Sequence, residues 1–383
     1  MFGPPRLLNR RSAPSRMHLI EHLYFHIPFC PKICPYCCFY VEEGSKNKNQ
    51  AFLDALLLEV DRASASYEIR PKTVYFGGGT PTALLTPQLE FLLTELSKRF
   101  PLTNLEEFTM EANPATIRPE KAALLAGAGV TRISLGVQSW NETTLKTLGR
   151  AHSASQAHRT VEILKAAGFP GLNIDLMFSV PGQSLEEWES DLQTTLSIAP
   201  SHISAYCLTY EEDTDFFRKL TGGQFVQNEE HDARLFEVTM DRLGAAGFSH
   251  YEISNHARPG HESRHNRAYW EGKSFLGFGP SAFSTVPEWR LQNVCDTAQY
   301  TRRLLAGEDP VISREPLQAD TRLREKIAFG LRMQEGLEAS LLAAWEKETA
   351  HFEEIGLMER AGSRLRLTRR GRMLADAVAE AFV

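Results

Sequence analysis

Three cysteines on one short stretch are the residues of this chain best suited to metal chemistry. Cys30, Cys34 and Cys37 follow an apolar run with the spacing C-x3-C-x2-C, and Cys38 stands directly behind the third. Cysteine thiolates are the usual ligands of iron–sulfur clusters, so three on one loop can hold three irons of a [4Fe-4S] cube. The fourth iron then has no protein ligand from this loop, as an open metal site requires. The spacing therefore predicts a cluster with one open iron.

A zinc site and plain thiols stay open as alternatives for these cysteines. Structural zinc normally uses a second cysteine pair or a pair of histidines nearby, and neither follows the loop. Disulfide bonds are disfavoured, because four cysteines within nine residues suit a metal loop better than a framework of bridges. The remaining two, Cys207 and Cys295, stand in apolar contexts, and we expect both to be buried like small hydrophobic side chains.

A glycine-rich run follows a short apolar segment at residues 73–76. Residues 77–82 read Gly-Gly-Gly-Thr-Pro-Thr. The run lacks the lysine of a P-loop and the G-x-G-x-x-G pattern, so it gives little support for phosphate or dinucleotide binding. Glycines after a strand let the backbone approach a ligand closely, and Pro81 stiffens the exit. Taken alone, the run is explained equally well as a tight turn between a strand and a helix.

Short apolar segments alternate with amphipathic ones through much of the chain. After the run that leads into the cysteines, strands are predicted at residues 73–76, 108–114, 132–139, 172–178 and 202–209. Helices are predicted at residues 51–65, 88–100, 120–128, 154–167 and 185–197. Such alternation is typical of βα units around a parallel sheet, and six units give a partial (β/α)6 barrel of the TIM type. Sites in such barrels lie at the carboxyl ends of the strands. The side chains expected there include Cys30, Gly78, Glu111, Gln138 and Asp175.

The βα rhythm stops after about residue 255, and we place a domain boundary there. Ahead of a barrel at 19–255, residues 1–18 are expected to form a disordered tail, because residues 1–16 hold four arginines, three prolines and no acid. A transit peptide would share that composition and stays an alternative. Residues 256–383 are predicted to form a smaller α+β domain. A helix is expected at 297–306. The helices at 321–332 and 341–354, two short strands and a last helix from 369 resemble a winged helix.

The overall composition excludes several classes of protein. The 383 residues are 42% hydrophobic and carry a net charge of −6. A nucleic-acid partner is not expected, since such binders present a basic face. Apolar runs of about 18 residues, which a membrane span needs, do not occur, and no signal-peptide core follows the N-terminus. Clustered cysteines among six in total suit a reducing cytoplasm.

Taken together, five motifs resemble the radical S-adenosylmethionine (SAM) superfamily. They are the stretch 24–39, the glycine run 77–82, Glu-Ala-Asn-Pro at 111–114, Gly-Val-Gln-Ser at 136–139 and Asn-Ile-Asp-Leu at 173–176. Within it they are most similar, over residues 19–370, to the branch of oxygen-independent coproporphyrinogen III dehydrogenase and the heme chaperone HemW. The resemblance implies that the cluster ligands are Cys30, Cys34 and Cys37. It further implies that the SAM site includes Tyr24, Gly78, Gly79, Thr80, Glu111, Gln138, Arg150 and Asp175.

The chemistry of SAM agrees with these side chains. Carboxylates such as Glu111 and Asp175 suit its ammonium group and its ribose hydroxyls, and a guanidinium such as Arg150 suits its carboxylate. Without the resemblance, Arg150 is explained as a surface charge near a helix end. In the same way, Asp175 is explained as half of a buried ion pair inside an apolar strand.

The branch offers two functions, and two features separate them. The dehydrogenase resembles C-x3-C-x2-C-x-C with a longer segment before its cysteines, whereas this chain has Phe39 at the fourth cysteine position. Residues 265–270 read His-Asn-Arg-Ala-Tyr-Trp, which matches the H-N-x-x-Y-W signature of the heme chaperones. The resemblance therefore implies a heme-binding chaperone in which His265 is the candidate axial ligand and Tyr269 and Trp270 form an aromatic wall. A packed domain junction stays open as the alternative role of this motif.

Several features around the motif stay open. His256 and His261 are alternative heme ligands, although loop histidines are usually solvated. Cys38 replaces an acidic residue common in the chaperones, and residues 279–283 lack a histidine common there, which puts a heme contact from that loop in doubt. The implied partners are heme and a heme-acceptor protein, the implied location is the cytoplasm or the periphery of a membrane, and both monomer and homodimer are compatible with the sequence.

Overall fold

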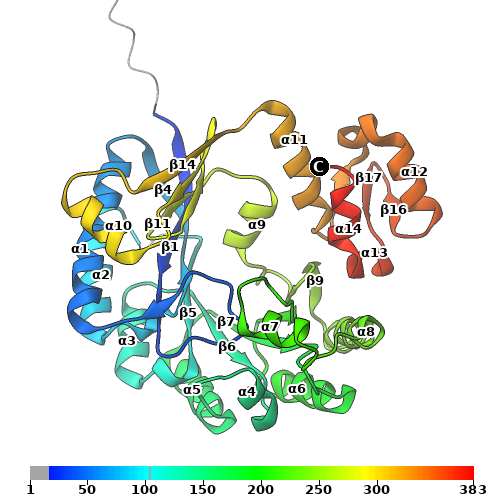
Figure 1. The fold of residues 1–383 in the computed structure, drawn as a ribbon, viewed down its shortest axis with the longest axis horizontal. Coiled ribbons are helices and arrows are strands. Elements are labelled where there is room, and N and C mark those ends of the chain that lie inside the picture. The colour runs from blue at the N-terminus through cyan, green and yellow to red at the C-terminus, as the bar shows by residue number, and fades with distance from the viewer. Residues whose placement is uncertain (1–16, 103–104) are drawn as a thin grey trace, which may run out of the picture.

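A nine-stranded sheet forms the centre of the chain (Figure 1). The structure is a computed structural model that describes residues 17–102 and 105–383, so residues 1–16 of the expected tail lie outside the described residues. The sheet has the order β11-β1-β4-β5-β6-β7-β8-β10-β9. Its six central strands are parallel and confirm the predicted (β/α)6 arrangement: β1 (Leu19–Ile27), β4 (Glu68–Gly78), β5 (Glu107–Ala112), β6 (Arg132–Gln138), β7 (Gly171–Phe178) and β8 (His202–Cys207).

Helices follow these strands, and most of them cover the outer face of the barrel (Figure 1), whereas the short helix Asp215–Thr221 packs against Tyr36 of the cysteine loop. They are α1 (Lys46–Ser64), α2 (Thr86–Arg99), α3 (Pro119–Gly127), α4 (Glu142–Thr147), α5 (Ala154–Ala167), α6 (Leu185–Ile198), α7 (Asp215–Thr221) and α8 (Glu229–Ala245). The local sequence determines where several of these helices begin and end. Helix α5 begins in a capping box between Ser153 and Gln156 and ends at Gly168, which adopts a left-handed conformation with φ 74°. Helix α6 begins with the same device at Ser184 and Glu187.

Alternation along the barrel strands separates an apolar outer face from a polar inner face. Because successive side chains of a strand point to opposite faces, every second residue packs under the helices. The buried outer residues include Leu23, Phe25, Ile27, Val74, Phe76, Phe108, Met110, Ile133, Leu135, Ile174, Leu176 and Ile203. Residues between them face inward and are mostly polar, among them Tyr75, Glu111, Ser134, Asn173, Asp175 and His202. The inner face therefore supplies the groups from which a site can be built.

The sheet continues past residue 255, where the sequence predicted a boundary. Strand β11 (Leu276–Phe278) pairs in parallel with β1, and Phe278 stacks on Phe25 with ring centroids 5.0 Å apart. Strands β10 (Asn255–Ala257) and β9 (Ser249–Glu252) complete the opposite edge. The first core reaches Leu304, whereas the second begins at Ile327. Residues 256–316 thus pack with the barrel, and we propose that the boundary lies near residue 317 instead.

Three further elements join the barrel before that point. They are α9 (Arg264–Trp270), α10 (Thr297–Leu305) and an antiparallel sheet of β12 (Phe283–Thr285), β13 (Trp289–Asn293) and β14 (Val311–Pro316). A two-stranded pair, β2 (Phe29–Cys30) and β3 (Glu42–Glu43), flanks the cysteine loop. None of the helices in residues 17–102 and 105–383 is long and apolar enough to cross a membrane.

The C-terminal unit has its own small core, as predicted. Its elements are α11 (Ala319–Leu331), β15 (Leu337–Glu338), a 3-10 helix (Ala339–Trp345), α12 (Glu346–Glu354), β16 (Met358–Ala361), β17 (Arg364–Leu367), α13 (Arg369–Met373) and α14 (Ala375–Glu380). The strands form an antiparallel sheet in the order β15-β17-β16, as a winged-helix-like unit requires. The single helix expected at 341–354 is divided, because Ala339–Trp345 form a 3-10 helix and the α-helix begins only at Glu346.

One buried carboxylate on α1 binds residues between 279 and 300 to the barrel. Glu59 on α1 accepts hydrogen bonds from the backbone N–H of Gly279 (2.9 Å), from Nδ2 of Asn293 (2.7 Å) and from the hydroxyl of Tyr300. Its side chain is 8% exposed, and burial raises the pKa of Glu59 to about 7 even though the three donors favour its charged form. Replacing it would leave several buried donors without an acceptor.

This carboxyl group predicts a pH-dependent stability. Between its ordinary value near 4.5 and the raised pKa of about 7, folded Glu59 keeps a proton that the unfolded chain releases. The free energy of unfolding should therefore fall as pH rises through this window, by on the order of 3 kcal/mol. The free energy of unfolding of Glu59→Gln, measured with urea, should lack this share of the pH dependence. The exposed variant Glu90→Gln should keep it. Equal slopes in both variants would contradict the assignment.

Candidate functional site

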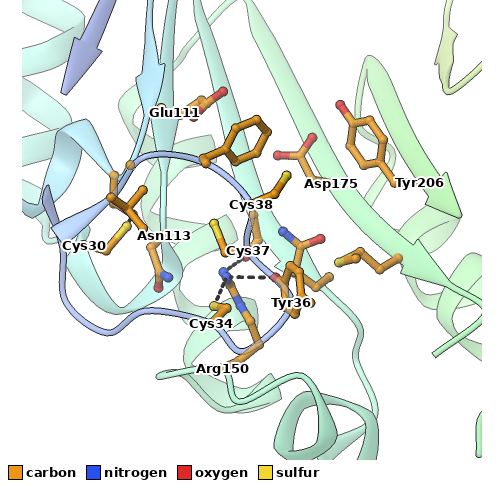
Figure 2. Close-up of a pocket in the computed structure, with 18 of the residues that line it drawn as sticks. Cys30, Cys34, Tyr36, Cys37, Cys38, Glu111, Asn113, Arg150, Asp175 and Tyr206 are labelled. Atoms are coloured by element: carbon orange, nitrogen blue, oxygen red, sulfur yellow. Dashed lines mark hydrogen bonds between the residues drawn. The ribbon is translucent and has the colours of Figure 1, made fainter. Parts of the chain in front are cut away.

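The three predicted cluster cysteines lie on one loop at the open end of the barrel (Figure 2). Cys30 ends β2, and Cys34 and Cys37 belong to a turn in which the N–H of Cys37 donates to the carbonyl of Cys34 (3.0 Å). All three side chains are partly buried, whereas Cys38 is exposed. Burial raises the pKa of Cys37 to about 11 and raises that of Cys30, so both thiols are neutral until a metal displaces their protons.

A cavity of about 380 Å³ joins this loop to the carboxyl ends of the barrel strands. Its volume falls in the range typical of small-molecule sites. The predicted site residues on its wall are Cys30, Cys34, Cys37, Gly78, Gly79, Thr80, Glu111, Gln138, Arg150 and Asp175. The structure thus brings together every predicted site residue except Tyr24 and His265.

The glycine run forms the cavity wall nearest the cysteine loop. Gly78 has φ +96°, a conformation that residues with side chains rarely adopt. A Cβ atom on Gly79 would lie 2.7 Å from the carbonyl oxygen of Ile27, so only glycine fits there. Thr80 then links the two loops, because its hydroxyl lies 3.5 Å from Sγ of Cys30 and its N–H donates to the carbonyl of Phe29 (2.8 Å). The glycines thus allow close packing against residues 26–28, and Gly78, Gly79 and Thr80 also line the cavity.

Two carboxyl groups face the cavity from neighbouring regions of the inner face. Glu111 on β5 accepts a hydrogen bond from the hydroxyl of Tyr75 (2.7 Å), and burial raises its pKa to about 7. Asp175 on β7 accepts bonds from Ser134 Oγ (3.1 Å) and Asn173 Nδ2 (2.6 Å), and burial raises its pKa as well. No salt bridge to either side chain occurs in the described part of the chain, so Asp175 is not half of a buried ion pair.

Arg150 and Gln138 complete the polar wall. Arg150 donates through Nη2 to the carbonyl of Gly136 (2.6 Å), and its Nη1 lies 3.4 Å from Sγ of Cys34 and 3.5 Å from the hydroxyl of Tyr36 (Figure 2). It is therefore a cavity residue and not a surface charge. Gln138 has φ 70°, unusual for a residue with a side chain, and its buried Oε1 has no hydrogen-bond partner in the described structure. A ligand that brings a donor to Oε1 would satisfy it.

Tyr24 and His265 lie outside the cavity wall. The Tyr24 hydroxyl is 3.2 Å from Nδ1 of His26, and its ring lies against Tyr75 with centroids 6.1 Å apart. His265 on α9 is fully buried, and its ring nitrogens lie 2.8 Å from Thr73 Oγ1 and 2.9 Å from the Tyr269 hydroxyl. Neither nitrogen is free to bind a heme iron in this arrangement.

Other expectations for single side chains need correction. His256 is not a solvated loop residue, because β10 buries it completely and stacks it on His250, whereas His261 is exposed as expected. Cys207 and Cys295 are exposed instead of buried. Cys207 lies at the last position of β8, where the packed layers end, and opens onto the cavity.

Sequence reasoning did not identify several residues of the cavity wall. These are Tyr36, Tyr75, Asn113, Ser134, Met177 and Tyr206. A signal existed for three of them, since Tyr75, Asn113 and Met177 each stand one residue before the end of a predicted strand. Period-two alternation from Glu111 and Asp175 identifies Asn113 and Met177 as inward-facing neighbours.

Comparisons with known proteins identify the family. The model of the radical SAM superfamily matches residues 24–194, and that of the HemN C-terminal domain matches residues 317–374. Heme chaperone HemW of Lactococcus lactis is 36% identical over 78% of this chain and 79% of its own length. Its counterpart from Mycobacterium tuberculosis is 37% identical over 85% of each chain. The chain belongs to the HemW family.

A solved structure also resembles this HemW-family chain along nearly its whole length. Coproporphyrinogen III oxidase (HemN) from Escherichia coli covers 96% of this chain and 90% of its own, with a TM-score of 0.83 and 22% sequence identity. At that identity the likeness bears on fold alone. It confirms the predicted partial barrel with a smaller C-terminal domain.

Glu111 provides a direct test of this site geometry. The Tyr75 hydroxyl stabilises its carboxylate, and the Asp175 charge disfavours it. We therefore expect Tyr75→Phe to raise the pKa of Glu111 above about 7 and Asp175→Asn to lower it. Carboxyl ¹³C NMR of glutamate-labelled protein measures both shifts, with Glu111→Gln to assign the resonance. Shifts in the same direction, or none, would contradict the described contacts.

Proposed function

We propose that this chain is a heme chaperone that binds heme and passes it to an acceptor protein, with a [4Fe-4S] cluster and SAM held in the cavity. The observation that carries the proposal is its membership of the HemW family, at 36–37% identity over 78–85% of the chain to relatives named heme chaperones. The donor set of the cavity supports the two cofactors independently of those names.

Cys30, Cys34 and Cys37 would hold the cluster. In the described residues, no three Cys, His, Asp or Glu side chains converge on a position suited to a single metal ion. A cube would suit three cysteines on one loop, because its thiolates bind separate irons, whereas zinc needs all its ligands around one ion. When bound, such a cluster supplies an electron and an open iron to a ligand beside it. Exposed Cys38 is not needed for this ligand set.

The remaining wall residues would orient SAM. Gly78 and Gly79 would offer backbone atoms to the ligand from the cavity wall, and unpaired Oε1 of Gln138 would offer an acceptor to its amino group. Glu111 and Asp175 suit the ammonium and ribose hydroxyls, and Arg150 suits the carboxylate. Because Arg150 also touches Cys34, its guanidinium would contact both the SAM carboxylate and a cluster ligand.

The alternative function is oxidative decarboxylation of coproporphyrinogen III. The likeness to HemN concerns the fold alone and therefore does not favour this activity. At the position where the dehydrogenase pattern has a fourth cysteine, this chain has Phe39, which is exposed on the loop. The heme-chaperone function is therefore preferred.

The partners proposed are heme and an acceptor protein, with a cytoplasmic location suited to free cysteines. The acceptor, contact with the membrane periphery, and the choice between monomer and homodimer stay predictions of the family resemblance. Nucleic acid is not proposed as a partner, given the net charge of −6.

Cluster assembly is the first test. Anaerobic reconstitution should give about four irons per chain and the broad visible absorption of a cube. Cys30→Ala/Cys34→Ala/Cys37→Ala should lose nearly all of this iron, whereas Cys295→Ala, which lies outside the cavity wall on the loop after β13, should keep it. Cys38→Ala should also keep about four irons. Full iron content in the triple variant would refute the ligand assignment.

The choice between chaperone and dehydrogenase is tested by product analysis. Reconstituted protein is incubated without oxygen with coproporphyrinogen III, SAM and a reductant, and in parallel heme-loaded protein is mixed with an apo-hemoprotein. We expect heme to move to the apo-protein, followed by its Soret band, and no protoporphyrinogen IX to accumulate. Steady formation of protoporphyrinogen IX would overturn the preferred function.

A further inference from the structure

The motif at residues 265–270 forms helix α9, and its histidine lies inside the barrel. His265 is fully buried, and both ring nitrogens are engaged, Nδ1 with Thr73 Oγ1 (2.8 Å) and Nε2 with the Tyr269 hydroxyl (2.9 Å). Desolvation lowers the pKa of His265 to about 3, so the ring is neutral and uses one nitrogen as donor and the other as acceptor. Binding a metal would require one of these buried bonds to break.

The ring of His265 leads directly to the cavity. It stacks on Tyr75 with centroids 5.2 Å apart and an interplanar angle of 29°. The Tyr75 hydroxyl then donates to Oε1 of Glu111 (2.7 Å), and Glu111 lines the cavity. Only one aromatic ring therefore separates the histidine of the motif from a carboxyl group of the SAM site.

Helix α9 is fixed at its start by a second carboxylate. Glu107, at the beginning of β5, accepts hydrogen bonds from Ser263 Oγ (3.1 Å), from the N–H of Arg264 (2.9 Å) and from the N–H of His265 (3.1 Å). Glu107 and Glu111 lie four residues apart on the same inner face of one strand. Strand β5 thus carries both Glu107, which binds the start of α9, and Glu111, which lines the cavity.

The far end of α9 is fixed by the C-terminal unit. Trp270 lies under the Arg332 guanidinium at 4.9 Å and contacts the Phe329 ring edge-on at 5.9 Å. Arg267 adds an ion pair with Glu335 (3.0 Å). A helix held at both ends keeps the His265 ring in one place, and a fixed ring restricts the Tyr75 ring stacked on it.

We propose that His265 is a positioning residue for the SAM site: it fixes Tyr75 and, through the Tyr75 hydroxyl, orients Glu111. This assignment rests on the proposed function, because Glu111 is taken to contact SAM. It gives the histidine a role that differs from that of an axial heme ligand, and it explains why the ring is buried against Tyr75 instead of facing a cavity. Tyr269 supports the same position from the other ring nitrogen.

The test compares His265→Gln with three other variants. Tyr269→Phe removes one partner of the imidazole, Tyr75→Phe removes the donor to Glu111, and exposed Lys273→Ala serves as the control from the same segment. The readouts are the pKa of Glu111 by carboxyl ¹³C NMR without cofactors, the SAM dissociation constant of reconstituted protein by equilibrium dialysis, and the Soret band on heme titration. Thermal melting identifies the folded variants that are compared.

We expect His265→Gln to raise the pKa of Glu111, to weaken SAM binding about tenfold and to leave the Soret band unchanged. Tyr269→Phe should act in the same direction more weakly, and Lys273→Ala should change nothing. Adding His265→Gln to Tyr75→Phe should give no further shift of Glu111, whereas a merely structural effect would add to it.

Two results would overturn the inference. One is an unchanged Glu111 titration in folded His265→Gln and Tyr269→Phe. The other is loss of the Soret band in His265→Gln with Glu111 unchanged, which would restore the ligand role. Failure of the wild-type protein to bind SAM would instead refute the proposed function, and the cofactor-free titration of Glu111 would still decide whether His265 positions it.

Discussion

The structure depends on one constraint, which is that the polar inner face of the barrel must stay hydrogen-bonded. Asn173 illustrates it, because its Nδ2 lies within bonding distance of Ser134, Asp175 and Ser204, and its Oδ1 lies 2.6 Å from Nδ1 of His202. Each buried donor or acceptor left unpaired costs about 1–3 kcal/mol. The network therefore restrains the rotamers beneath the cavity. The cavity above it is therefore lined by restrained side chains, as the proposed cofactor site requires.

Much of this site could be predicted from the sequence, because two simple rules apply to it. The carboxyl ends of parallel strands meet at one end of a barrel, and side chains alternate along each strand. Glu111, Gln138 and Asp175 satisfy both rules and line the cavity. For the cysteine loop, the spacing of Cys30, Cys34 and Cys37 was enough to predict them as candidate ligands. Tyr24 shows where the rules stop, since it faces inward opposite Tyr75 but its hydroxyl turns to His26, away from the cavity.

The boundary proposed near residue 317 and the role proposed for α9 could not be derived from the sequence, because both depend on contacts between segments distant in sequence. Strand β11 has three residues, too few for a periodic signal, yet it completes the barrel edge beside β1. Likewise, nothing local to residues 265–270 indicates that the histidine stacks on Tyr75 while the tryptophan packs on α11. A short motif can match a family signature and still leave open which of its side chains meets a ligand.

The central claim is that the cavity holds a three-cysteine cluster whose fourth iron is open to SAM. Mössbauer spectroscopy of ⁵⁷Fe-reconstituted protein tests it most directly, because each iron of the cube contributes separately to the spectrum. Our account predicts that one of about four irons differs from the others and that SAM changes the isomer shift of this iron alone. Four equivalent irons, or a spectrum that SAM leaves unchanged, would contradict the account.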